Sequence, residues 1–163
     1  MTQAPMPEAA ADRPASLPWP PILLAAIVAA AVAAGYAAPL PWPGLDDLMG
    51  HVAGLSLGAA GIALIAWAAW TFRRHGTTIL PDQAADVLVT DGPFRFRRNP
   101  IYIGHVLMLL GIAEVTHNIW FAILAVPYIP LVTWLAVLPE EHHLEARFGD
   151  AYRAYKARTR RWI

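Results

Sequence analysis

The chain lacks cysteine altogether and carries little charge. Without cysteine, disulfides, thiolate catalysis and cysteine-based metal sites are all excluded. Charged residues make up 15% of the 163 residues, hydrophobic residues make up 57%, and the formal net charge is zero. This composition is too apolar for an ordinary soluble domain. We therefore expect a membrane protein, monomeric or homodimeric, with membrane lipids around it and no nucleic-acid partner.

Four apolar segments follow one another, over about 21–40, 48–72, 101–116 and 119–138. A bilayer core of about 30 Å needs about 20 helical residues, so the third segment is short. Backbone groups inside a membrane must bond to one another, which favours helices. The sequence thus predicts an all-α integral membrane protein with about four transmembrane helices.

The residues ahead of these segments, 1–20, are rich in proline and alanine and are expected to form a disordered leader. The remainder, 21–163, is expected to form a single membrane domain. Its first segment ends in small residues, as a signal peptide does, but the positive charge ahead of it is limited to Arg13 and the apolar run is long. These features favour an uncleaved anchor.

Small residues mark one side of the second segment, where Gly50, Gly54, Gly58 and Gly61 follow one another at about four-residue spacing. Such a stripe lets two membrane helices pack closely. The alternative is a span rich in alanine and glycine that simply faces lipid. We favour the packing interpretation, which predicts a second helix along this stripe.

The positive charges indicate the orientation. If all four segments cross the membrane, every Lys and Arg falls on one side, and the opposite loops, 41–47 and 117–118, carry none. The positive-inside rule then places both termini in the cytoplasm. We expect a multi-pass protein of the bacterial inner membrane. The residues concerned are Arg13, Arg73, Arg74, Arg95, Arg97, Arg98, Arg147, Arg153, Lys156, Arg158, Arg160 and Arg161.

An arginine-rich stretch, 92–104, leads into the third apolar segment. Asn99 is a good N-cap residue and Pro100 suits the first helical position, so a helix is predicted to begin there. An arginine stripe touching lipid phosphates would explain part of this stretch. It would not explain why Tyr102, Gly104 and His105 follow on the first turns.

Two adjacent acids, Glu140 and Glu141, follow the fourth segment. Glutamate is unfavourable at a helix C-terminus, so Pro139 is predicted to start a new helix with both acids in its first turn. That helix, at about 140–158, has an amphipathic pattern typical of a helix on the cytoplasmic membrane surface. A simple interfacial cap or a membrane-anchoring tail remain as alternatives.

Together the two motifs resemble the isoprenylcysteine carboxyl methyltransferase family and the related phospholipid N-methyltransferases, over 77–163. Those families are integral membrane enzymes that use S-adenosylmethionine. Their first motif is Arg-(His or Asn)-Pro-x-Tyr-x-Gly, and position 99 is Asn here where the eukaryotic carboxyl methyltransferases have His. Their second motif is matched by Glu140, Glu141, Leu144, Phe148, Gly149, Tyr152, Tyr155, Arg161 and Trp162.

The resemblance implies a methyltransferase with a lipophilic or lipid-linked acceptor that presents a carboxylate, a thiol or an amine. Carboxylates can accept from the ribose of S-adenosylmethionine or pair with its ammonium, and helix N-terminal amides can receive its carboxylate. Arg161, Glu141 and Arg98 are the candidate catalytic residues, and His142 or His143 can serve as a base. The candidate cofactor-binding residues are Arg98, Asn99, Pro100, Tyr102, Gly104, His105, Glu140, Glu141, Leu144 and Tyr152.

Two other functions compete. Membrane sterol and enone reductases that bind NADPH share a similar C-terminal pattern, but they are longer and have more membrane helices. A small four-helix transporter would need an acid within the membrane, and Glu114 is the candidate. The transporter interpretation gives no role to Asn99 or to the paired glutamates.

Overall fold

The computed structural model describes residues 19–44, 47–77 and 87–162. Most of the leader assigned to 1–20 lies outside these residues, and Trp19 and Pro20 already belong to the first helix. The described chain is helical and contains no strand, only one isolated bridge between Arg97 and Arg160. Its elements are α1 (Trp19–Ala37), α2 (Leu48–Arg74), the 3₁₀ helix η1 (Gly92–Arg95), α3 (Pro100–Thr116), α4 (Trp120–Val132), the π-helical η2 (Thr133–Val137), α5 (Leu138–Phe148) and α6 (Asp150–Arg158).

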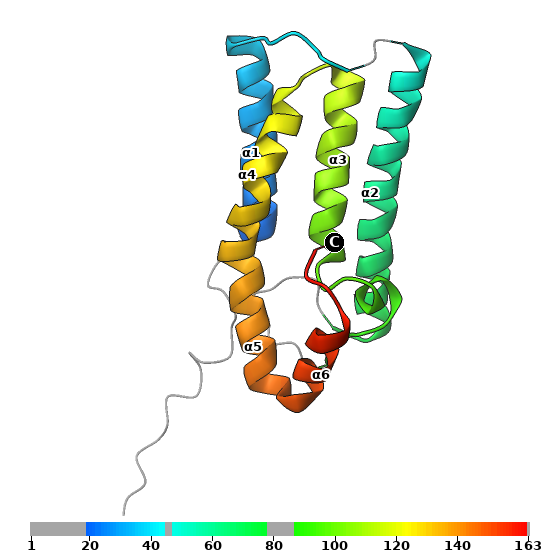
Figure 1. Cartoon of the computed structure of the whole chain (residues 1–163), viewed down its shortest axis with the longest axis vertical. Helices are drawn as coiled ribbons and strands as arrows, with labels where there is room; N and C mark the ends of the chain where they lie inside the picture. Colours follow the sequence, from blue (N-terminus) through cyan, green and yellow to red (C-terminus); the bar gives the residue numbers. More distant parts are fainter. Residues whose placement is uncertain (1–18, 45–46, 78–86, 163) are drawn as a thin grey trace, which may run out of the picture.

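The long helices stand side by side, with α1 against α4 and α2 against α3 (Figure 1). The all-α membrane fold is confirmed: α1, α2 and the helix Trp120–Phe148 are long and apolar enough to cross a membrane. The third expected span, α3, has 17 residues and is about 25 Å long, shorter than a bilayer core. Four crossing helices are therefore not established by length.

Glycines bring α2 and α3 into close contact, as the small-residue stripe predicted. A Cβ added at Gly111 would lie 2.5 Å from the Gly58 nitrogen and 2.7 Å from the Gly54 carbonyl oxygen. A Cβ at Gly61 would lie 2.6 Å from the Gly104 carbonyl oxygen. Because a side chain at these positions would collide with backbone, the two helices can approach only through glycine. This contact fixes the start of α3 against α2.

The helix that begins at Trp120 runs without a break through α4, η2 and α5 to Phe148. The prediction that Pro139 starts a new helix is therefore wrong. A proline ring clashes with the carbonyl four residues earlier in an α-helix, and the π-helical turn before Pro139 loosens the helix where that clash would fall. The chain reverses instead at Gly149, whose φ of 51° suits glycine, and α6 turns back toward α3 (Figure 1).

Candidate functional site

The candidate site lies at the end of the bundle where α2 ends, α3 begins and α5 and α6 meet (Figure 1). In the described chain, every arginine and the one lysine belong to segments at this end. The two sequence motifs, which lie far apart along the chain, come together here. The C-terminal tail after α6 returns to the first turn of α3 and closes the arrangement.

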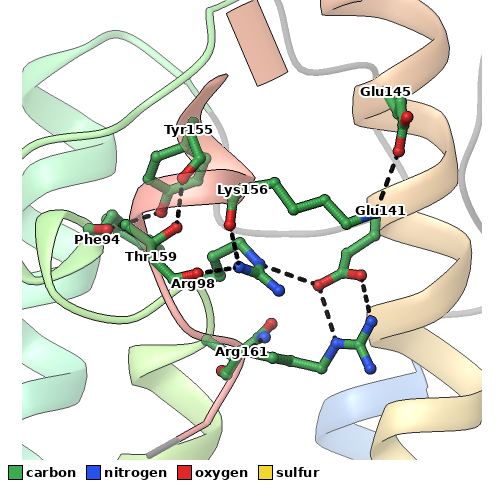
Figure 2. Close-up of polar contacts among 9 residues, drawn as sticks. Phe94, Arg98, Glu141, Glu145, Tyr155, Lys156, Thr159 and Arg161 are labelled. Atoms are coloured by element: carbon green, nitrogen blue, oxygen red, sulfur yellow. Dashed lines mark hydrogen bonds and ion pairs between the residues drawn. The ribbon is translucent and has the colours of Figure 1, made fainter. Parts of the chain in front are cut away.

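Glu141 holds the centre of this site between two arginines (Figure 2). Its carboxylate accepts from Arg98 Nε at 3.1 Å, and from Arg161 Nε at 3.0 Å and Nη2 at 2.6 Å. The side chains of Arg98 and Glu141 are 10% and 8% exposed. The hydrogen bond to Glu141 raises the pKa of Arg161, so its guanidinium group stays charged. We call these three residues the Arg98–Glu141–Arg161 cluster; it joins α3's leading loop, α5 and the tail.

Arg98 also binds the main chain of the C-terminal segment. Its Nη1 donates to the carbonyl oxygens of Lys156, at 3.2 Å, and Thr159, and its backbone N–H donates to the Arg160 carbonyl at 3.0 Å. The Lys156 carbonyl lies in the last turn of α6, where carbonyls have no partner inside the helix, and the other two follow the helix. Arg98 thus both hydrogen-bonds the carbonyls at and after the end of α6 and pairs with the charge of Glu141.

Asn99 does not cap α3, and the prediction that it does is wrong. It occupies the N-cap position, but its side chain makes no capping hydrogen bond. Its φ of −124° and ψ of 54° depart from the extended backbone of a capping residue. Its Nδ2 instead donates to the Arg161 carbonyl oxygen at 3.1 Å. Asn99 therefore holds the tail in place beside the cluster.

Two tyrosines of α6 pack beside the cluster. The Tyr155 hydroxyl donates to the Phe94 carbonyl at 2.7 Å and ties α6 to η1 (Figure 2). Burial raises the pKa of Tyr155 to about 12, so its hydroxyl stays neutral and remains a donor. Tyr152 is also buried, and burial likewise raises its pKa. On the outside, Lys156 pairs with Glu145 at 3.2 Å and fastens α6 to α5.

Glu140 differs from its neighbour, because it makes no hydrogen bond or ion pair with any described residue. It lies close enough to Tyr102 to act on it electrostatically. The π-helical turn explains its direction. Twelve α-helical steps would set Glu140 about 120° around the helix from Tyr128, and the extra residue of a π turn reduces this offset to about 20°. The unpaired carboxylate therefore shares a face with Tyr128, toward the bundle.

Aromatic rings form the wall between this carboxylate and the bundle. Tyr102 is 8% exposed, and its ring centroid lies 6.4 Å from that of Trp162 on the tail and 6.0 Å from that of His105. A free acid, two guanidinium groups and an aromatic wall thus meet at the boundary between the charged end and the apolar bundle. The site therefore combines polar groups on one side with apolar ring surface on the other.

The remaining predicted residues surround this centre at different distances. Pro100 is buried at the first turn of α3, and Leu144 lies half-buried on α5. Gly104 faces α2, where a Cβ would lie 2.8 Å from the Gly61 carbonyl oxygen, so its visible role is helix packing. His142 is exposed.

Sequence reasoning missed two features of the site. Tyr128, on α4, is completely buried and bonded to His105; its signal is a lone tyrosine between Pro127 and Pro130 in an otherwise apolar segment. The second feature is the pair of carbonyl oxygens, of Lys156 and Thr159, that accept from Arg98. Every residue has a backbone carbonyl, so the residue types do not predict this contact. Backbone acceptors of this kind become visible only in the fold.

Comparisons with known proteins identify the family of the chain. The model of the family described as PEMT, phospholipid methyltransferase, matches residues 49–151, which is more than half of the chain and includes both acids and the arginine-rich stretch. The chain belongs to the phospholipid methyltransferase family. It is also similar to an uncharacterized protein of Haemophilus influenzae, with 32% identity over 65 residues, or 39% of this chain and 100% of that protein. No solved structure matches it.

Proposed function

We propose that this member of the phospholipid methyltransferase family transfers a methyl group from S-adenosylmethionine to a lipophilic or lipid-linked acceptor. The observation that carries the proposal is the meeting of the Arg98–Glu141–Arg161 cluster with the unpaired Glu140 at the end of an apolar bundle. The family match supports a membrane methyltransferase. The donor and the acceptor are our inference.

The charged groups present fit the polar parts of S-adenosylmethionine. Glu140 has no protein partner among the described residues and can accept from an ammonium or a ribose hydroxyl. Arg161 is the more exposed of the two arginines, with 35% of its side chain accessible, and can receive a carboxylate while it stays bonded to Glu141. The rings of Tyr102 and Trp162 offer an apolar surface. When bound, this molecule supplies an electrophilic methyl group on a sulfonium.

The protein contributes mainly by positioning. Holding two reactants in contact accounts for much of the barrier reduction in such a displacement. The polar donor would enter from the charged end, where α6 and the tail bear arginines, and the acceptor would enter laterally from lipid. With the positive-inside rule, the charged end faces the cytoplasm of a bacterial inner membrane. An acceptor with a carboxylate, a thiol or an amine fits this geometry.

Isothermal titration of the purified protein in nanodiscs tests the proposal. We expect S-adenosylmethionine to bind with a stoichiometry near one and NADPH not to bind. The matched variant is Glu140→Gln, which removes one negative charge and keeps the side-chain size. Binding of NADPH in place of S-adenosylmethionine would favour a reductase and would contradict the proposal.

A further inference from the structure

A buried histidine in the bundle has a partner that the proposed site does not use. His105 lies one turn beyond Tyr102 on α3 and is 9% exposed. Its Nδ1 is 2.7 Å from the hydroxyl oxygen of Tyr128 on α4, and Tyr128 is fully buried. Polar side chains inside a membrane bundle are costly and mark functional positions. A hydrogen bond between helices is the simpler explanation, and it accounts for only one of the two ring nitrogens.

The second nitrogen, Nε2, makes no hydrogen bond with any described residue. In a neutral imidazole one nitrogen carries the proton and the other accepts, and the bond made by one nitrogen decides the role of the other. The Tyr128 hydroxyl can accept from Nδ1–H or donate to Nδ1. In the tautomer whose Nδ1–H donates to the Tyr128 oxygen, Nε2 keeps a free lone pair. His105 then carries an available proton acceptor between α3 and α4, one turn deeper in the bundle than Tyr102.

The helix opposite His105 is irregular at the same depth. Pro127 and Pro130 flank Tyr128 on α4, and the π-helical η2 follows. Prolines remove backbone donors, and π turns inside α-helices occur often at functional sites. These irregularities hold Tyr128 against His105 and turn Glu140 toward the same side. The pair therefore lies next to Tyr102, whose ring centroid is 6.0 Å from that of His105, and so beside the proposed donor site.

We infer that His105 is the base that takes a proton from the methyl acceptor, and that Tyr128 is the positioning residue that fixes its tautomer. This inference rests on the proposed function. The acceptor's lone pair forms a bond to the methyl carbon as the carbon–sulfur bond breaks, and the sulfur keeps the electron pair. An acceptor whose reacting atom is N–H, S–H or O–H loses one proton, which passes to His105 Nε2 and then to water. A carboxylate acceptor would need no base.

The tautomer of His105 can be measured directly. We would label the histidines with ¹⁵N, place the full chain in lipid bilayers and record solid-state NMR spectra, with His105→Gln identifying the signal. We expect a protonated Nδ1 and an unprotonated Nε2, and we expect Tyr128→Phe to abolish this preference. Tyr155→Phe, which removes a buried hydroxyl elsewhere, is the matched control and should leave the His105 signals unchanged. A protonated Nε2 in the parent protein would overturn the inference.

The same samples separate this inference from the proposed function. S-adenosylmethionine affinity, measured by titration, should be unchanged in Tyr128→Phe. With methyl-labelled donor and vesicles of a bacterial polar lipid extract, His105→Gln should lower the rate of labelling about 100-fold or more. Full activity in His105→Gln would refute the base assignment and leave the methyltransferase proposal intact. Failure of the parent protein to bind the donor would instead refute the proposed function.

Discussion

The two adjacent acids should respond very differently to loss of charge. Glu141 is 8% exposed and lies between two guanidinium groups, whereas Glu140 has no partner among the described residues. Glu141→Gln leaves the buried charge of Arg98 without its counter-ion. Glu140→Gln removes a charge that stabilises nothing visible in the fold. The substitutions are chemically identical, so each serves as the control for the other.

The structure sets the size of each effect. Breaking a buried ion pair by removing one partner costs about 3–5 kcal/mol, and the glutamine at 141 still offers one acceptor oxygen, so we expect about 3 kcal/mol. For a chain of this length that corresponds to a fall in melting temperature of about 10 °C. Glu140→Gln should change the free energy of unfolding by about 0.5 kcal/mol or less. A lost charged hydrogen bond of about 1.5–3 kcal/mol should weaken donor binding about 10- to 100-fold.

Thermal unfolding in nanodiscs and isothermal titration with S-adenosylmethionine measure both quantities on the same preparations. We expect low stability with Glu141→Gln and low affinity at normal stability with Glu140→Gln. If Glu140→Gln binds the donor as the parent protein does, Glu140 has no part in the site. If Glu141→Gln melts at the parent temperature, the cluster does not hold the fold together.

Three further outcomes follow from the geometry. Gly111→Ala should lower the free energy of unfolding by about 1–3 kcal/mol, because its Cβ would meet backbone. Gly58→Ala is the control, since its Cβ would meet nothing within 4 Å. Equal free energies of unfolding for the two variants, measured by denaturation, would contradict the packing of α2 against α3. Tyr102→Phe should keep the melting temperature but lower donor affinity or turnover, and normal values in both assays would make Tyr102 a packing residue only. Single cysteines at Arg95 and Asp150 should resist an impermeant thiol reagent in intact cells. Labelling of either cysteine would contradict the predicted cytoplasmic location of the charged end.

Much of the fold was predictable from the sequence because membrane constraints are strong. The first three apolar segments matched α1, α2 and α3 to within a few residues, whereas the fourth helix continues past the predicted end at 138 to Phe148. The glycine stripe predicted the contact between α2 and α3. Pro139 led to the wrong prediction of a helix start, because the π turn before it removes the clash that proline causes in an ordinary α-helix. The sequence contains no pattern that predicts this π turn. The turn also determines the direction in which Glu140 points.

The candidate site was predictable in its members and not in their pairing. Two separate motifs predicted Arg98, Glu141 and Arg161, and the structure brings them together. Asn99 looked like a helix cap, but the returning tail offers a carbonyl that only the fold reveals. Tyr128 escaped notice because one tyrosine in an apolar segment is unremarkable until its partner is known.

The most direct test of the methyltransferase proposal is transfer itself. The purified protein would be incubated in vesicles of bacterial polar lipid with methyl-labelled S-adenosylmethionine, and the lipid phase and the aqueous phase would be analysed separately by mass spectrometry. We expect label in one or more lipid-phase products, an equal amount of S-adenosylhomocysteine in the aqueous phase, and strong reduction of both with Glu140→Gln. Appearance of neither product from folded protein that binds the donor, across lipid extracts of several bacteria, would contradict the proposed transfer to a lipophilic acceptor.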